Sequence, residues 1–368
     1  MKWRLLNLGK NDGFYIQSVY EAVAKAVTQQ ISPNTLILIY PASPYVCIGV
    51  HQELEKEVDT EYCSNHRIPI VRRQTGGGAV YLDSFQQFYQ IIIHKEDPLI
   101  PLDIGSFYRK FLQVTAHVYQ RFGLPAEYAP INDVIINGRK ASGNGAVTLD
   151  DSLVLIGNVI FDLDIDTMTN VLKVPSEKFK DKMALSLKTY MTSLKRELGS
   201  IPKRDVVVQY LVNEYENLLK TPLIPGNLTS AEREYLTETL QRLTSEEWLH
   251  KTSRRRERLL SLVKAKCTKI KGGVMVCEAS HKAEKLIRIT LETVDGRISD
   301  ILISGDFFYE PEDALGELED ELRGIKIRKK LLTQKIEEFF EKNQIRLAGV
   351  TARDFVEAIL RAQSKVKR

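Results

Sequence analysis

Short apolar runs alternate with helical periods through the first two thirds of the chain. Runs of β-branched and apolar residues bounded by Pro, Gly or Ser predict strands. They cover Trp3–Leu8, Thr35–Tyr40, Tyr45–Ile48, Ile68–Arg72, Gln87–His94, Val134–Ile136 and Leu153–Phe161. Apolar residues spaced three and four apart predict helices. They cover Gly13–Gln29, Ser106–Phe122, Asp205–Leu219 and Ser230–Leu243. Because hairpin signals such as Asn137-Gly138 occur between strands, we expect an α+β fold with a mixed, largely antiparallel sheet and flanking helices.

The pattern changes after a charged stretch, Ser245–Arg258, which predicts a connector between domains. Three further strands with tight turns predict a meander, and three helical periods follow it. These segments are Lys269–Glu278, Leu286–Val294, Ile298–Ile303, Pro311–Leu322, Arg328–Lys342 and Thr351–Ala362. We therefore expect a domain over residues 1–248 and a small α+β domain over residues 249–368. The length of 368 residues agrees with two domains of roughly 150 residues each.

Composition excludes several classes of protein. Hydrophobic residues make up 43% and charged residues 27%, which is ordinary for a globular chain and excludes a collagen-like, low-complexity or wholly disordered one. The net charge of +4 is too small to indicate nucleic-acid binding. From Lys251 onward there are 26 Lys and Arg against 19 Asp and Glu, so the basic surplus belongs to the C-terminal third.

Targeting signals and metal motifs are not evident. The N-terminal apolar run is too short for a signal peptide, and no run approaches the ~18 residues of a membrane helix, so we expect a cytoplasmic protein that binds no membrane. The four cysteines lack CxxC spacing. Cys267 and Cys277 could pair across a hairpin at Gly272-Gly273, but two buried thiols are favoured. The six histidines have no ligand spacing that indicates a metal site.

The segment Arg72–Tyr81 contains three consecutive glycines after two arginines. Glycines permit positive φ, and successive N–H groups can then surround an anion. Arginine recognises phosphate or carboxylate through two parallel hydrogen bonds. The segment is neither a P-loop nor a dinucleotide fingerprint, since it lacks both spacings. The alternative is a plain hairpin turn with surface arginines, but such a turn needs fewer glycines.

A second segment, Asn132–Ala146, places an Asn-Asp pair before a short strand and an Asn-Gly turn after it. Lys140 then begins a loop of small residues, where it can act as a fixed positive charge on a carboxylate or phosphate. Asp133 is a candidate for helping to hold Mg²⁺ beside phosphates. The alternative is a hairpin with an exposed lysine.

Together these two segments closely resemble the signature segments of the lipoate–protein ligases, in order and in separation. Leu153–Leu163, Trp248, Ile303–Phe308 and Leu347–Val350 resemble later parts of the same family. The resemblance implies a biotin/lipoate-ligase-like catalytic domain followed by the family's accessory domain. It implies that lipoate (or octanoate) attacks ATP to give an acyl-AMP, and that a lysine of a lipoyl domain or H-protein-like acceptor then takes the acyl group.

The resemblance also implies roles for individual residues. Lys140 is the expected catalytic residue, in contact with the carboxyl oxygen and the α-phosphate, and Asp133 is the expected Mg²⁺ contact. The expected ligand-binding residues are Arg72, Arg73, Thr75, Gly76, Gly77, Gly78, Ala79, Asn132, Asp133, Lys140, Ser142 and Gly143. ATP, lipoate and Mg²⁺ are expected as substrates and metal, without a tightly bound prosthetic group, and we expect a monomer.

Two departures from the family pattern concern polar side chains. Leu82 stands where the family usually has a histidine, and Gln86 or Gln87 stands where it has an asparagine. Ile156 replaces a second histidine, before Gly157. A divergent ligase that serves an unusual acceptor would account for both.

Three other interpretations compete with the ligase. An octanoyl or lipoyl transferase of the same superfamily uses a cysteine nucleophile after the lysine segment, and no cysteine lies between Lys140 and Cys267. A biotin ligase normally has Gly-Arg-Gly in its glycine segment. A non-catalytic homologue that only binds lipoyl domains would not need the arginines, glycines and lysine that are present here.

Overall fold

The computed structural model describes residues 3–101, 103–173, 177–252, 267–269, 274–311 and 314–364, without the side chains of 177–179, 267–269, 274 and 275. The chain divides into two compact units. Unit 1 comprises Met1–Cys47, Val58–Gln74 and Val80–Ser245, and unit 2 comprises Ile48–Glu57, Thr75–Ala79 and Glu246–Arg368. The segment with the three glycines thus belongs to the same unit as the C-terminal part of the chain.

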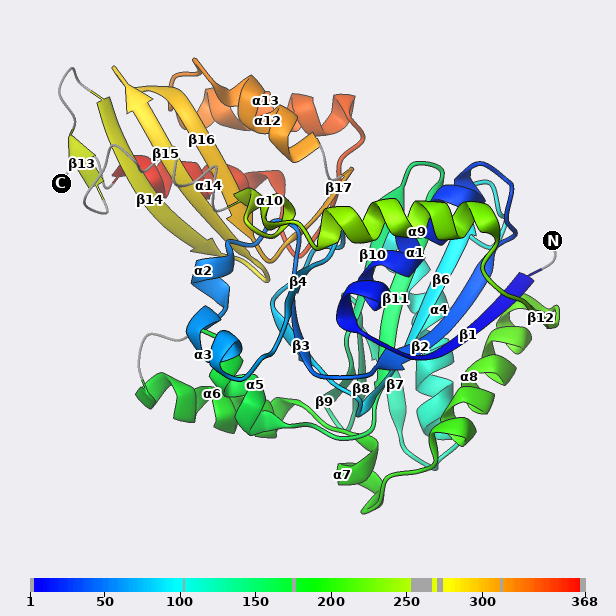
Figure 1. Ribbon diagram of the computed structural model, residues 1–368. Helices are drawn as coiled ribbons and strands as arrows, with labels where there is room; N and C mark the ends of the chain where they lie inside the picture. The colour runs from blue at the N-terminus through cyan, green and yellow to red at the C-terminus, as the bar shows by residue number, and fades with distance from the viewer. Residues whose placement is uncertain are drawn as a thin grey trace. The chain divides into compact units, whose positions relative to one another are not determined.

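A mixed sheet forms the centre of unit 1 (Figure 1). Its strands, in sheet order, are β10 (Asn144–Leu149), β11 (Ser152–Ile160), β6 (Gln86–His94), β2 (Thr35–Pro41), β1 (Trp3–Asn11) and β12 (Leu223–Pro225). β1 runs parallel to β2 and β12, and the other neighbours are antiparallel. Two smaller sheets join β4 (Ile70–Arg72), β3 (Tyr45–Ile48) and β5 (Val80–Leu82), and β7 (Ala126–Ala129), β8 (Asp133–Ile136) and β9 (Arg139–Ser142). The expected mixed sheet is confirmed.

Helices cover both faces of this sheet, as Figure 1 shows, with α1 (Gly13–Thr28) and α9 (Ser230–Leu243) on one side and α4 (Ile104–Gln120) and α8 (Arg204–Leu219) on the other. The central strands are therefore apolar on both faces, as in Thr35–Tyr40. Asp12 and Asp103 cap the first turns of α1 and α4. The other helices of this unit are α3 (Thr60–Asn65), α5 (Ile165–Val171), α6 (Glu177–Tyr190) and α7 (Leu194–Leu198).

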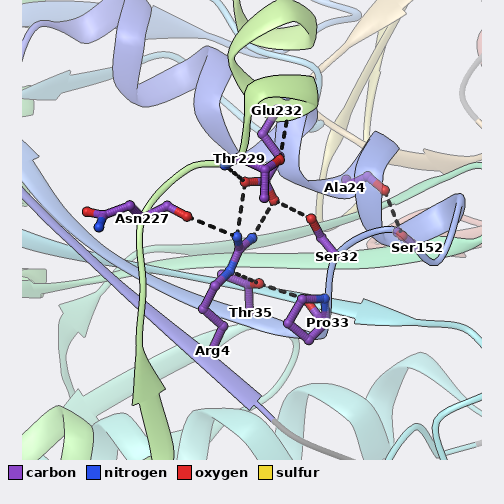
Figure 2. Close-up of polar contacts among 9 residues, drawn as sticks. All are labelled: Arg4, Ala24, Ser32, Pro33, Thr35, Ser152, Asn227, Thr229 and Glu232. Atoms are coloured by element: carbon purple, nitrogen blue, oxygen red, sulfur yellow. Dashed lines mark hydrogen bonds and ion pairs between the residues drawn. The ribbon is translucent and has the colours of Figure 1, made fainter.

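A buried ion pair joins α9 to β1 of the sheet (Figure 2). Arg4 of β1 donates two hydrogen bonds to Glu232, and its Nε donates to Thr35 Oγ1 at 3.1 Å. Glu232 also accepts from Ser32 Oγ at 2.8 Å and from the backbone N–H of Thr229 at 2.8 Å. Burial would raise the pKa of Glu232, but the hydrogen bonds from Arg4 and Thr229 outweigh it and hold that pKa below its usual range.

In unit 2, a meander packs against three helices around a separate apolar core. The strands are β13 (Cys267–Lys269), β14 (Val274–Lys282), β15 (Leu286–Val294), β16 (Arg297–Gly305), β17 (Phe308–Glu310) and β18 (Arg346–Ala348). The helices are α2 (Leu54–Glu57), α10 (Glu246–Leu249), α12 (Ala314–Leu322), α13 (Lys329–Lys342) and α14 (Ala352–Ser364). The predicted strands Leu286–Val294 and Ile298–Ile303 and the three predicted helices are confirmed. The predicted turn at Gly272-Gly273 and part of the predicted connector Ser245–Arg258 lie outside the described residues.

The prediction of free thiols in this hairpin is wrong. Cys277 is disulfide-bonded, and the ladder between β13 and β14 places Cys267 directly opposite it. Cys47 and Cys63, by contrast, are free and buried. In the part of the chain that is described, no helix combines the length and the apolar character needed to span a membrane.

Candidate functional site

Lys140 and Asp133, which the sequence singled out, lie side by side on the β8–β9 hairpin. The Nζ of Lys140 is 2.6 Å from Oδ1 of Asp133. Their side chains are 37% and 31% exposed, so a ligand can reach the pair. The turn between them is the predicted Asn137-Gly138, with positive φ at both residues. Lys140 lies on β9 and not at the start of a loop as expected, because its backbone pairs with Ile135 of β8.

The small residues after Lys140 are anchored to β11. Ser142 is fully buried, and its Oγ donates to the carbonyl oxygen of Asn158 at 2.6 Å. The N–H of Gly143 donates to Oδ1 of Asn158 at 2.8 Å. The hydroxyl of Ser142 is thus occupied by the protein itself, whereas Gly143 keeps open space on its Cβ side, with only Asn158 Oδ1 at 3.9 Å.

Asn132 is joined to Asn144 by a reciprocal pair of hydrogen bonds. Nδ2 of Asn132 donates to the carbonyl oxygen of Asn144, and Nδ2 of Asn144 donates to that of Asn132 at 2.9 Å. The structure therefore brings Asn132, Asp133, Lys140, Ser142 and Gly143 together, and it gives Asn132 a role in holding the backbone.

The two arginines lie at the end of β4. Arg72 is fully buried, while Arg73 is half-buried and donates from Nη1 to the carbonyl oxygen of Cys47 at 3.1 Å. Burial raises the pKa of the Cys47 thiol despite the nearby Arg73. Binding of a ligand by either arginine stays a prediction.

The three glycines have different environments. A Cβ on Gly76 would lie 2.8 Å from the carbonyl oxygen of Phe307, so this position needs the close approach that only glycine permits. Gly77 has φ of +95°, which favours glycine. A Cβ on Gly78 would meet no described atom within 4 Å. Packing therefore accounts for Gly76 and backbone conformation for Gly77, and Gly78 is the one of the three with space for a side chain.

Residues 48–57 support this loop within unit 2, which the sequence did not predict. The N–H of Val50 donates to the carbonyl oxygen of Thr75 at 3.2 Å. The ring of His51 stacks on Phe307 at 5.4 Å, and Ser304 Oγ donates to Glu53 Oε1 at 2.6 Å. No sequence motif links these segments, since they are far apart along the chain.

Most of the positions that depart from the family pattern are part of the interior, whereas Ile156 is only partly buried. Leu82 is buried on β5 beside Tyr45. Gln86 accepts a hydrogen bond from Nδ2 of Asn158 at 2.6 Å, and Gln87 donates to the carbonyl oxygen of Ile39 at 3.1 Å. Both glutamines therefore form hydrogen bonds within the fold.

Asp83 is a titratable residue that sequence analysis did not select. Burial raises the pKa of Asp83 to about 6, although the N–H of Phe85 donates to it at 2.9 Å and lowers that pKa. The carboxylates of Asp164 and Asp162 raise it further. An Asp two residues after a buried Tyr gives no sequence signal for such a shift.

Comparison with known proteins identifies the family. Residues 12–216, more than half of the chain, match the lipoyl protein ligase A/B catalytic domain. The chain belongs to this family. Residues 286–359 match the bacterial lipoate protein ligase C-terminus. The chain is thus an enzyme of the lipoate ligase and octanoyltransferase group.

Relatives of both activities are similar to this chain. Octanoyltransferase LipM of Kyrpidia tusciae is 26% identical over 268 residues, which cover 67% of this chain and 97% of the relative. Lipoate-protein ligase LplJ of Bacillus subtilis is 25% identical over 341 residues, which cover 92% of this chain and 95% of the relative. The match to the ligase thus extends over more of the chain.

Solved structures show the same fold. A bipartite lipoate protein ligase of Thermoplasma acidophilum, studied with its E2 lipoyl domain, is 26% identical with a TM-score of 0.60, covering 67% of this chain and 96% of its own. Lipoate-protein ligase A bound with ATP is 23% identical with a TM-score of 0.58, covering 67% of this chain and 98% of its own. LipL1 of P. falciparum in complex with lipoate is 14% identical with a TM-score of 0.70, and the match covers both chains completely.

Proposed function

We propose that the protein is a lipoate–protein ligase that activates lipoate or octanoate with ATP and transfers the acyl group to a lysine of a lipoyl-domain or H-protein-like acceptor. The observation that carries the proposal is the accessible Lys140–Asp133 pair on the β8–β9 hairpin. In the first step the acyl carboxylate attacks the α-phosphorus and pyrophosphate leaves. In the second step the acceptor amine attacks the acyl carbon and AMP leaves.

Fixed positive charge lowers the barrier of both steps because negative charge is concentrated on the phosphate and carboxyl oxygens. In this proposal Lys140 supplies that charge, and Asp133 holds the ammonium in place until the ligand arrives. The guanidinium of Arg73, which belongs to the same unit as Lys140, would contribute further donors. AMP is already a good leaving group, so the reaction needs no protein nucleophile.

Mg²⁺ would arrive with the phosphates of ATP. Among the described residues no group of three or more His, Cys, Asp or Glu is arranged to hold a metal ion. Mg²⁺ does not need such a group, because it is commonly bound through one or two carboxylates together with substrate phosphates. Asp133 would be its protein contact and would help to neutralise the phosphate charge.

The cysteines support the ligase over a transferase with a thioester intermediate. A nucleophilic thiol needs a lowered pKa and access to substrate. Burial raises the pKa of Cys47, and raises that of Cys63 to about 11. Cys277 is in a disulfide. The match of residues 286–359 to the bacterial lipoate protein ligase C-terminus supports the same choice.

Octanoyl transfer is the second candidate, because octanoyltransferases are among the similar relatives.

We further propose a cytoplasmic monomer whose basic C-terminal third attracts an acidic acceptor. If this attraction operates, added salt should raise the KM for the acceptor.

The deciding experiment incubates the protein with lipoate and Mg-ATP and follows pyrophosphate release. A ligase releases pyrophosphate, modifies a lipoyl domain, and loses acyl transfer in Lys140→Ala. Untouched ATP together with transfer from octanoyl carrier protein would refute the ligase and favour the transferase. Binding of a lipoyl domain without either reaction would indicate a non-catalytic module.

A further inference from the structure

Tyr89, Gly157 and Asn144 form one row across three neighbouring strands. The register pairs Tyr89 of β6 with Gly157 of β11, and Gly157 with Asn144 of β10. A Cβ on Gly157 would lie 2.2 Å from the Tyr89 hydroxyl oxygen and 2.1 Å from Oδ1 of Asn144. The missing side chain therefore opens the space through which the Tyr89 hydroxyl reaches Asn144.

The hydrogen bonds along this row have a defined direction. The Tyr89 hydroxyl donates to Oδ1 of Asn144 at 2.6 Å and accepts from Thr115 Oγ1 at 2.7 Å. Tyr89 and Thr115 are fully buried, and burial raises the pKa of Tyr89, so the phenol stays protonated. Because Tyr89 occupies Oδ1 of Asn144, the amide nitrogen of Asn144 points to the carbonyl oxygen of Asn132.

The hydrogen bonds from Thr115 through Tyr89 and Asn144 to Asn132 form a relay. This relay ends beside Lys140 and Asp133 of the site. Asn132 directly precedes Asp133, and its own amide bonds back to the carbonyl oxygen of Asn144. The reciprocal pair thus joins the start of β8 to the start of β10 around β9, which carries Lys140. The Asn132–Asn144 pair therefore holds the backbone that brings Asp133 Oδ1 and Lys140 Nζ to 2.6 Å from each other.

We propose that Tyr89 and Asn144 are positioning residues that fix the Asp133–Lys140 pair for acyl transfer. The inference rests on the proposed role of Lys140, but it applies to either donor of the acyl group. Without the Tyr89 hydroxyl, Oδ1 of Asn144 would keep only the contact with Ser142 Oγ at 3.2 Å, and the single proton of that hydroxyl already goes to the carbonyl oxygen of Asn158 at 2.6 Å. The Asn132–Asn144 pair would then loosen, and Asp133 would move with it.

The test compares Tyr89→Phe with Tyr215→Phe. Tyr215 is a matched control, since it is fully buried, lies in the same core with its ring 5.9 Å from that of Tyr89, and has a hydroxyl without a hydrogen-bond partner among the described residues. One lost buried hydrogen bond of about 1–1.5 kcal/mol corresponds to roughly a tenfold effect. We expect Tyr89→Phe to lower kcat about tenfold with each KM changed less than about twofold, and Tyr215→Phe to leave kcat within about twofold.

Hydrogen exchange supplies a readout that does not require activity. Amides of residues 132–145 should exchange about tenfold faster in Tyr89→Phe than in Tyr215→Phe. Asn144→Ala should lower kcat at least as much as Tyr89→Phe, and the double variant should be no worse than Asn144→Ala alone, because both residues act through one relay.

The results separate the two proposals. Equal exchange and equal kcat in Tyr89→Phe and Tyr215→Phe would overturn the positioning role, as would additive losses in the double variant. Faster exchange in Tyr89→Phe with lowered transfer from octanoyl carrier protein, but no pyrophosphate release by the unmodified enzyme, would support the positioning role and refute the ligase.

Discussion

The Arg4–Glu232 pair permits a quantitative prediction of stability. Glu232→Gln keeps the shape of the side chain and removes its charge, which leaves the Arg4 guanidinium buried at 9% exposure without its counter-ion. Breaking a buried ion pair by removing one partner costs about 3–5 kcal/mol. Because glutamine still accepts one hydrogen bond, we expect the lower end, about 3 kcal/mol.

The matched control lies on the same helix. Glu238 of α9 pairs with Lys25 at 2.9 Å, but these side chains are 64% and 44% exposed. Exposed pairs contribute about 0–1 kcal/mol, so Glu238→Gln should change the stability of unit 1 by less than about 1 kcal/mol. Both variants lose one carboxylate. A difference in the stability of unit 1 between them therefore reports the effect of burying the ion pair.

Unfolding of unit 1 can be followed through a single tryptophan. The chain has two tryptophans, and Trp3 is buried in unit 1 directly before Arg4. In a Trp248→Phe background, urea titration monitored by fluorescence would report this unit alone. If Glu232→Gln destabilises unit 1 no more than Glu238→Gln does, the ion pair does not hold α9 to the sheet.

The pH dependence has a defined sign. The pKa of Glu232 is depressed in the folded state, so its contribution is present above the unfolded value of about 4.3 and is lost as pH falls through the folded value. The gap in stability between the parent protein and Glu232→Gln should therefore narrow in acid below about pH 4. A gap that stays constant down to pH 3 would contradict this assignment.

Two further predictions concern the loops around the site. Gly76→Ala should lower the melting temperature because its Cβ would lie 2.8 Å from the Phe307 carbonyl oxygen, whereas Gly78→Ala should leave it unchanged; equal shifts in differential scanning calorimetry would contradict this difference. The pKa of Asp83 is raised to about 6, so its ionisation costs stability as pH rises from about 4 to 6. Asp83→Asn should stabilise the protein by roughly 2–3 kcal/mol at pH 7.5 and by much less at pH 4, and an equal effect at both pH values in urea titrations would refute the shift.

The local pattern of apolar and polar residues was sufficient to predict the helices and strands with regular periodicity. The β8–β9 hairpin follows from Val134–Ile136 and the Asn137-Gly138 turn, and both turn residues have positive φ. The helix α6 was not predicted, because its polar residues outnumber its apolar ones and give no clear apolar face. The strand position of Lys140 was missed because the small residues after it are typical of a loop, whereas hydrogen bonds to β8 decide its conformation.

Contacts between distant segments could not be predicted from the sequence. Gly157 is one residue in an apolar strand, and its importance depends on the register that places Tyr89 and Asn144 on either side of it. The contact of Gly76 with Phe307 likewise depends on residues 48–57 and 75–79 joining the C-terminal part of the chain in one unit. No spacing along the chain encodes such contacts.

The two signature segments combine residues that hold the fold with residues that can meet a ligand, and exposure separates them. Arg72 and Ser142 are fully buried, so their side chains serve the interior. Lys140 and Asp133 are about one third exposed, and a Cβ on Gly78 would meet no described atom within 4 Å. A substitution of a buried signature residue should therefore lower stability and activity together, whereas Lys140→Ala should abolish transfer without unfolding the protein. The resemblance alone treats all these positions alike, whereas their exposure in the structure distinguishes the side chains that a ligand can reach from those that it cannot.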